Sequence, residues 1–238
     1  MNDKITVCLG KGGQREMAES FARKNNVPIM DKPGEHLTVM FDSRGVSLTG
    51  YGLTYQGDFE GMLHRVTNGR LSHEMLVRAV KTEGEHLKAI DATAGMGEDG
   101  FLLAAYGYEV TLYEQNPVIA ALLKDALRRA RKHPVLKDIA SRMKLVEGDS
   151  VSCMEKLMDP VDVIYLDPMF PKRQKSGLIN KKLQLIQKLE PPCSEEKDLF
   201  DAAIKAGPSR IIKSVCLDGR EPSYILKGKA IRYDCYVM

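Results

Sequence analysis

Four stretches of this chain carry residue types that could bind a nucleotide-like ligand or act on a substrate, and each follows a short apolar run. They are the glycine-rich stretch 91–100, the acid Glu114, the pair Asp149 and Ser150, and the acid Asp167. A carboxylate can accept hydrogen bonds from ribose hydroxyls, and glycine lets the backbone approach a ligand closely. A single acid at such a place commonly caps a helix, and Asp149 and Ser150 suit that role. The four stretches together favour a cofactor site.

The stretch 91–100 reads Asp-Ala-Thr-Ala-Gly-Met-Gly-Glu-Asp-Gly and contains the spacing G-x-G-x-x-G at Gly95, Gly97 and Gly100. That spacing suits either NAD or S-adenosylmethionine, and so does an acid after the next strand. S-adenosylmethionine is favoured because Asp91 and Thr93 are polar, whereas a dinucleotide site has an apolar strand running into its first glycine. A dinucleotide site also needs a second mononucleotide-binding half, and no later stretch of the sequence clearly supplies one.

The motif Asp167-Pro168-Met169-Phe170 has the composition that methylation of an exocyclic amine requires. The lone pair of such an amine is delocalised into the ring, so the nitrogen is a poor nucleophile. Asp167 and the Pro168 carbonyl can accept its hydrogens and disperse positive charge as it develops. Phe170 can stack on the base. The motif therefore predicts an amine methyltransferase with Asp167 and Phe170 as catalytic residues.

Basic residues follow this motif directly. They are Lys172, Arg173, Lys175, Lys181 and Lys182, with Asn180 among them. They could grip phosphates on either side of a base drawn into the pocket, or they could form a solvated loop. We favour the phosphate contacts because the loop leaves the catalytic motif. A second basic cluster, at 128–133, is interpreted as solvated surface.

The pattern of apolar runs predicts an α/β protein with a mostly parallel sheet, because strands and helices alternate. Strands are predicted at 89–92, 110–113, 143–146, 161–166 and 210–213, and helices at 100–106, 117–132, 151–157 and 195–205. A further helix is predicted at 71–81 with Ser72 as a possible N-cap, and a terminal hairpin at 225–237 across Gly228. Residues 1–60 are predicted to form a small α+β unit, with strands at 5–9, 37–41 and 46–48 and a helix at 14–24, and residues 61–238 to form the catalytic domain.

Composition limits the class of protein and the cell compartment that fit this sequence. The chain has 238 residues, a formal net charge of +3 and 43% hydrophobic residues, values that are ordinary for a globular protein. No apolar run approaches the roughly 20 residues that cross a bilayer. Five scattered cysteines without a Cys-x-x-Cys pair favour a reducing cytoplasm and no metal site. Cys153 and Cys193 are poor candidates for a nucleophile, because neither lies in a Pro-Cys loop at a strand end.

The motifs also resemble a known family. The stretch 91–100, the run Tyr113-Glu114-Gln115-Asn116-Pro117 and the run 165–176 are similar to successive motifs of class I S-adenosylmethionine-dependent methyltransferases. Within that class they resemble the bacterial small-subunit ribosomal RNA guanine-N2 methyltransferase J family, most closely from about residue 64 to 190. The resemblance implies a Rossmann-like fold and methyl transfer from S-adenosylmethionine to the N2 amine of a guanine in 16S ribosomal RNA. The implied partner is ribosomal RNA or the small ribosomal subunit.

Residue roles can be carried over where the motifs match. From the residue types and their positions we expect cofactor contacts at Asp91, Gly95, Gly97 and Glu114. The resemblance adds Glu98, Asp99, Gln115, Asp149, Ser150 and Asp167. Substrate contacts are expected from Lys172, Arg173 and Lys175, and the resemblance adds Arg70, with Arg65 near it. The sequence departs from the family at Glu98, where a basic residue is usual, and at Lys213-Ser214-Val215, where Lys-Arg-Pro is usual.

Three other functions fit parts of the pattern. An amine methyltransferase could act on DNA, protein or a small molecule. An NAD-dependent oxidoreductase would use the glycine-rich stretch and Glu114 but leave the motif at Asp167 unexplained. An RNA-binding module without activity would carry a vestigial cofactor site, which the intact acids disfavour.

Overall fold

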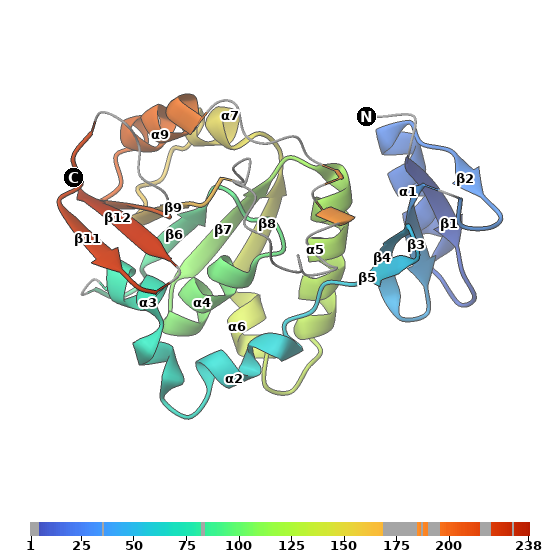
Figure 1. Ribbon diagram of the computed structural model, residues 1–238, viewed down its shortest axis with the longest axis horizontal. Helices are drawn as coiled ribbons and strands as arrows, with labels where there is room; N and C mark the ends of the chain where they lie inside the picture. The colour runs from blue at the N-terminus through green and yellow to red at the C-terminus, as the bar shows by residue number, and fades with distance from the viewer. Residues whose placement is uncertain are drawn as a thin grey trace.

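A computed structural model gives the structure of the protein. It describes residues 5–34, 36–81, 84–168, 185–186, 188–189, 196–214, 220–229 and 231–238. Two sheets organise these residues. A five-stranded sheet is built from residues 5–55, and a seven-stranded sheet is built from residues 88–237. Figure 1 shows the smaller sheet beside the larger body, with helix α5 between them.

The larger sheet has the strand order β11-β12-β10-β9-β6-β7-β8. Its strands are β6 (Lys88–Asp91), β7 (Glu109–Glu114), β8 (Met143–Glu147), β9 (Val163–Leu166), β10 (Arg210–Lys213), β11 (Tyr224–Lys227) and β12 (Arg232–Val237). The chain runs outward from β6 through β7 to β8, and then returns to the other side of β6 with β9. All pairings among β6 to β10 are parallel, and β12 runs antiparallel to both β10 and β11. In such sheets a ligand binds at the carboxyl ends, where the strand order reverses.

Helices cover both faces of this sheet (Figure 1). One face carries α3 (Met75–Val80), α4 (Glu98–Tyr106), α5 (Pro117–Ala130) and α6 (Lys137–Ser141), and the other carries α7 (Ser150–Glu155) and α9 (Glu196–Lys205). Phe101, Leu102 and Leu103 of α4 are fully buried against the sheet. Leu199 and Phe200 of α9 pack on the opposite face. The site at the strand ends is therefore supported by a two-sided apolar core.

The smaller sheet has the order β2-β1-β3-β4-β5. It comprises β1 (Ile5–Leu9), β2 (Ile29–Met30), β3 (Leu37–Asp42), β4 (Gly45–Gly50) and β5 (Leu53–Tyr55), and α1 (Arg15–Asn25) packs on it. Val39 and Leu48 are cross-strand partners and are fully buried. Their core continues into Val118 and Leu122 of α5. Helix α5 thus packs on both sheets, because its apolar residues extend around more than one side.

A buried charge lies where the two sheets meet on α5. Asp125 is 1% exposed and forms ion pairs with Arg128 and Arg129 of the same helix. Arg129 also donates to the Gly57 carbonyl. Gly45 has a φ of +124°, and a Cβ there would lie 2.2 Å from an oxygen of Asp125. Glycine is required at this turn by the close approach of the helix as well as by its backbone conformation.

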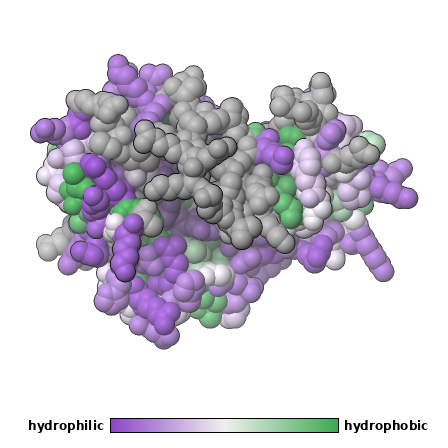
Figure 2. Space-filling model, viewed as in Figure 1, coloured by the Kyte–Doolittle hydropathy of each residue, from purple (hydrophilic) through white to green (hydrophobic). Residues whose placement is uncertain are grey.

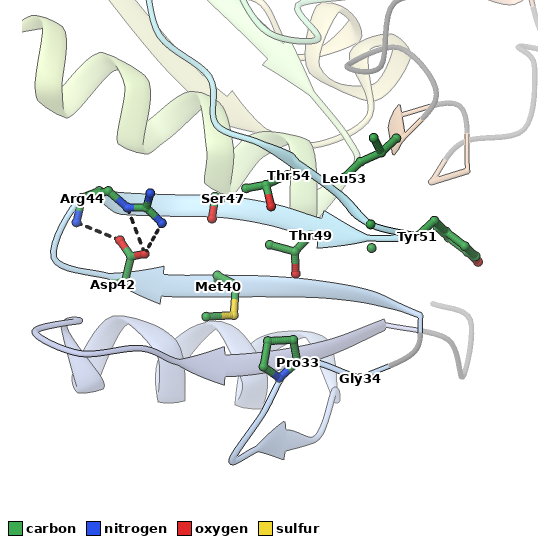
Figure 3. Close-up of a pocket in the computed structure, with 12 residues that line it drawn as sticks. Pro33, Gly34, Met40, Asp42, Arg44, Ser47, Thr49, Tyr51, Leu53 and Thr54 are labelled. Carbon is green, nitrogen blue, oxygen red and sulfur yellow. Dashed lines mark hydrogen bonds and ion pairs between the residues drawn. The ribbon is translucent and has the colours of Figure 1, made fainter.

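The other face of the smaller sheet is open. Ser47, Thr49, Thr54 and Met40 line a hollow of about 650 Å³ there, and the Asp42–Arg44 ion pair lies at its end (Figure 3). This hollow is distant in the sequence from every motif that predicts chemistry. Its lining is part polar and part apolar and comes from the strands of the smaller sheet and the loops beside them.

The predicted alternation of strands and helices is confirmed, with ends that move by one or two residues. One detail was wrong. The helix predicted at 71–81 begins at Met75 with Glu74 as its N-cap, because residues 70–73 form a 3-10 turn and Ser72 donates to the Gly69 carbonyl within it. The terminal hairpin of antiparallel strands at the sheet edge is confirmed, and its second strand, β12, is the one that pairs with β10. The division at residue 60 stays a prediction.

The visible surface is mostly hydrophilic over the coloured residues, with apolar residues in small separate groups (Figure 2). Across the ranges that the structure describes, none of the helices combines the length and the apolar character needed to span a membrane.

Candidate active site

The glycine-rich stretch forms the loop between β6 and α4, and the neighbouring strands hold it on both sides. The backbone N–H of Ala92 donates to the Tyr165 carbonyl on β9 at 3.0 Å, and the N–H of Ala94 donates to the Tyr113 carbonyl on β7 at 3.1 Å. The loop therefore lies across the point where the strand order reverses, which is where an α/β sheet binds its ligand.

The three glycines of this loop have different roles. Gly95 has a φ of +52° and open space around an added Cβ, whose nearest contact would be a carbonyl 3.9 Å away. An added Cβ at Gly97 would lie 2.8 Å from Leu123, and one at Gly100 would lie 2.3 Å from Leu112. An added Cβ would thus meet open space at Gly95 but side chains of neighbouring elements at Gly97 and Gly100, and cofactor contact at Gly95 and Gly97 stays a prediction.

Asp91, the last residue of β6, supports the loop through hydrogen bonds to its backbone. Its carboxylate accepts from the backbone N–H of Thr93 at 3.2 Å and from that of Gly100 at 3.1 Å, and the residue is 1% exposed. Burial and the nearby Asp99 raise the pKa of Asp91 to about 8. Its backbone partners make Asp91 a support for the loop, and direct contact with a cofactor stays a prediction.

Glu114 ends β7 and joins two neighbouring segments. One carboxylate oxygen accepts from the Gly95 N–H at 2.9 Å and the other accepts from the Asn116 N–H at 2.7 Å. Asn116 in turn caps α5, its side-chain oxygen accepting from Val118 and Ile119, and Pro117 occupies the first helical position. Each oxygen of a carboxylate can accept more than one hydrogen bond, and the binding of ribose hydroxyls by Glu114 stays a prediction. Gln115 beside it is exposed.

Asp149 and Ser150 lie where β8 passes into α7. Asp149 is the N-cap of α7, accepting from the Ser152 N–H at 2.9 Å, and this bond lowers the pKa of its carboxyl. Ser150 donates its hydroxyl to the Ala92 carbonyl in the glycine loop. The capping role expected for Asp149 is confirmed. The bond from Ser150 connects the glycine loop to the segment that follows β8.

Asp99, in the first turn of α4, accepts a hydrogen bond from the Tyr165 hydroxyl at 3.0 Å. Tyr165 belongs to β9, is 1% exposed and packs edge-on against Tyr233 of β12. Burial and the charge of Asp167 raise the pKa of Asp99 to about 6. Glu98 precedes it as the first residue of α4 and is half-buried.

Asp167 follows β9 directly and is held at two points. Its backbone N–H donates to the Thr93 hydroxyl of the glycine loop at 2.7 Å, and its carboxylate accepts from the hydroxyl of Ser214, the residue after β10. Loss of solvent around the carboxyl raises its pKa, and the bond from Ser214 opposes that rise. The catalytic motif and the cofactor loop are thus bonded to each other.

Asp91, Asp99 and Asp167 form an acid cluster, the name used below for these three carboxyls. Burial raises the pKa of all three, Asp99 and Asp167 also raise the pKa of Asp91, and Asp167 also raises that of Asp99. Arg65 lies near Asp99 but is engaged by Glu74 in a two-bond ion pair at 2.8 and 2.7 Å. Because clustered acids repel, a cationic ligand would be favoured here. S-adenosylmethionine, with a sulfonium and an amino group, fits this requirement.

Several predicted site residues can be placed only in part. Arg70 is exposed at the start of the 3-10 turn 70–73, and its contact with substrate stays a prediction. Phe170, Lys172, Arg173 and Lys175 lie outside the described residues, and so do Asn180, Lys181 and Lys182. No sequence pattern assigned a role at the site to Tyr165 or to Ser214. No local signal in the sequence connects either residue to the acids that they contact.

The arginines of the basic cluster at 128–133 form ion pairs and hydrogen bonds with other residues of the chain. Arg128 and Arg129 pair with Asp125, and Arg131 donates to the carbonyls of Ala140 and Met143.

Cys153 is the described cysteine that the sequence analysis weighed as a nucleophile. Burial raises the pKa of its thiol, which disfavours the thiolate that a nucleophile requires.

Comparisons with known proteins decide the family. A family model described as putative SAM-dependent methyltransferase matches residues 52–238. The ribosomal RNA small subunit methyltransferase J of Thioalkalivibrio sulfidiphilus is 37% identical and covers 98% of each chain, and that of Pseudomonas fluorescens Pf-5 is 40% identical over 99% of this chain and 97% of its own. The chain belongs to the ribosomal RNA small subunit methyltransferase J family.

A solved structure supports the fold independently. The crystal structure of a SAM-dependent methyltransferase from Neisseria gonorrhoeae has a TM-score of 0.78 to this chain, with 26% identity and coverage of 98% and 95%. The expected Rossmann-like methyltransferase fold, the methyltransferase class and the cofactor S-adenosylmethionine are therefore confirmed. The NAD-dependent alternative is set aside, and so is a module without enzymatic activity.

The acid cluster predicts that cofactor binding by this methyltransferase depends on pH. A cation near Asp99 favours its ionised form, so we expect affinity for S-adenosylmethionine to rise between about pH 5 and pH 7, around the pKa of about 6. Titration calorimetry in two buffers of different ionisation enthalpy should show protons released on binding. S-adenosylhomocysteine, which lacks the sulfonium charge, should release fewer. Asp99→Asn should reduce the release and the exposed Asp159→Asn should not, whereas equal release by all three proteins would contradict the assignment.

Proposed function

We propose that this methyltransferase transfers a methyl group from S-adenosylmethionine to the exocyclic N2 amine of a guanine in small-subunit ribosomal RNA. The observation that carries the proposal is the placement of Asp167 at the end of β9, bonded through Thr93 to the cofactor loop. The relatives named ribosomal RNA small subunit methyltransferase J support the RNA substrate.

Asp167 and the backbone carbonyl of Pro168 would accept the hydrogens of the amine. The Asp167 carboxylate accepts one of its hydrogens and directs the nitrogen lone pair toward the methyl carbon. The nitrogen–carbon bond would form as the carbon–sulfur bond breaks with its electron pair leaving on sulfur, and the nitrogen would then release its proton to water. Asp167 stabilises the positive charge that develops on nitrogen during this step. The bound cofactor supplies the methyl group as an electrophilic sulfonium.

The remaining residues would hold the two reactants. Glu114 is proposed to bind the ribose, and Gln115, Asp149 and Ser150 to lie at the adenine end, since all four lie at the carboxyl ends of β7 and β8, at the same edge of the sheet. We propose that Phe170 stacks on the guanine. Lys172, Arg173, Lys175 and Arg70 are proposed to contact phosphates of the RNA. We also propose that the protein acts on ribosomal RNA in the cytoplasm.

Nucleoside mass spectrometry of 16S ribosomal RNA from cells with and without this gene tests the proposal. We expect one N2-methylguanosine to disappear without the gene and to return on complementation with the wild-type chain but not with Asp167→Ala. Unchanged N2-methylguanosine would refute the substrate, and a missing methyl group on another amine would redirect the proposal to that acceptor.

A further inference from the structure

Ser214 lies beside the catalytic motif because of strand pairing. Strand β10 runs parallel to β9 with Lys213 opposite Leu166, so the residues that follow these partners are neighbours across the sheet. The backbone N–H of Ser214 donates to the Leu166 carbonyl at 3.0 Å, which continues the ladder by one more bond. The backbone of Ser214 is thereby fixed before its side chain makes any contact.

The Ser214 hydroxyl donates to the Oδ1 oxygen of Asp167. We propose that Ser214 is a positioning residue for methyl transfer, whose hydroxyl fixes one oxygen of the Asp167 carboxylate and leaves the other for the acceptor amine. This inference rests on the proposed function of Asp167. A carboxylate rotates readily about its last side-chain bond, so one anchored oxygen sets the plane in which the second can accept.

Anchoring at both ends makes Asp167 rigid relative to the cofactor loop. Thr93 accepts from the backbone N–H of Asp167, and Ser214 donates to its side chain. The two partners come from opposite sides of β9, one from the loop after β6 and the other from the end of β10. A small displacement of a group that orients a nucleophile can reduce the rate strongly, which is why such anchors matter.

The charged surroundings of Asp167 give Ser214 a second effect. Asp91 of β6 and Asp99 of α4 face it as acids, while Tyr165 of β9 and Tyr233 of β12 are buried hydroxyls in electrostatic contact with it. Burial raises the pKa of the Asp167 carboxyl, and the bond from Ser214 opposes that rise and favours the ionised carboxylate. Loss of the hydroxyl should therefore raise the pKa of Asp167, and activity at low pH should decline.

Ser214→Ala tests the inference, with Ser214→Thr as the variant that keeps a hydroxyl. We expect Ser214→Ala to lower kcat about tenfold at neutral pH, the loss of one hydrogen bond to a charged group, with an unchanged KM for RNA. The acidic limb of the pH–rate profile should move to higher pH. Ser214→Thr should restore most of the rate. Ser209→Ala, an exposed serine before the other end of β10, should behave as wild type.

A second readout needs no RNA. The pH dependence of S-adenosylmethionine binding, measured by calorimetry, should also move to higher pH in Ser214→Ala, because Asp167 belongs to the acid cluster. This separates the two hypotheses, since a wild-type enzyme that methylates no RNA would count against the proposed function while the binding curve still tests Ser214. An unshifted binding curve in Ser214→Ala, or a loss of rate that Ser214→Thr shares in full, would overturn the inference.

Discussion

Asp167→Ala is expected to abolish methyl transfer while leaving measurable binding of S-adenosylmethionine. The carboxylate is bonded to Ser214, and its backbone N–H is bonded to Thr93 of the cofactor loop. The alanine variant keeps the backbone bond, so the loop keeps its support. It loses the acceptor that orients the amine and stabilises charge on nitrogen. Mutations of groups with such roles commonly cost about 10²- to 10³-fold in kcat, and a loss of at least about 10³-fold is expected here.

Two further variants make the Asp167 experiment specific. Asp167→Asn keeps one acceptor oxygen but removes the charge, so an intermediate rate is expected. Asp159→Ala removes an aspartate whose side chain is 82% exposed and should retain the wild-type rate. Single-turnover rates with saturating cofactor would report the chemical step. Full activity of Asp167→Ala would remove Asp167 from the mechanism.

Glu114→Ala is expected to weaken binding of S-adenosylmethionine by about a hundredfold. The variant leaves the N–H groups of Gly95 and Asn116 without their carboxylate acceptor and removes the proposed ribose ligand. A hydrogen bond to a charged group contributes about 1.5–3 kcal/mol, and about 3 kcal/mol corresponds to roughly a hundredfold in affinity. The loop at Gly95 and the start of α5 should both become less ordered.

Calorimetric Kd values and urea unfolding of the free protein would separate the two effects of Glu114→Ala. We expect a loss of about 1–3 kcal/mol in the free energy of unfolding, because the partly buried N–H groups of Gly95 and Asn116 lose their acceptor. Glu109→Ala changes an exposed glutamate at the other end of β7 and should alter neither quantity. An unchanged Kd in Glu114→Ala would exclude Glu114 from the cofactor site.

Much of the site was readable from local sequence. The glycines at 95, 97 and 100, the acids after the apolar runs and the motif beginning at Asp167 are short-range patterns, and each ends or begins an element as predicted. What these patterns left open was how the three glycines differ. Only packing distinguishes Gly95, which faces open space, from Gly97 and Gly100, which lie against Leu123 and Leu112.

The sequence by itself determined the alternation of strands and helices, the position of the acids at strand ends and, through its motifs, the cofactor class. Apolar periodicity and glycine or proline chemistry act between near neighbours, so they can be read along the chain. The tertiary structure decided which strand ends meet. Strand β9 inserts beside β6 and β10 beside β9, and this order brings Asp167 to Thr93 and to Ser214, residues 74 and 47 positions away. Contacts at such separations depend on strand order and side-chain packing, for which no local pattern exists.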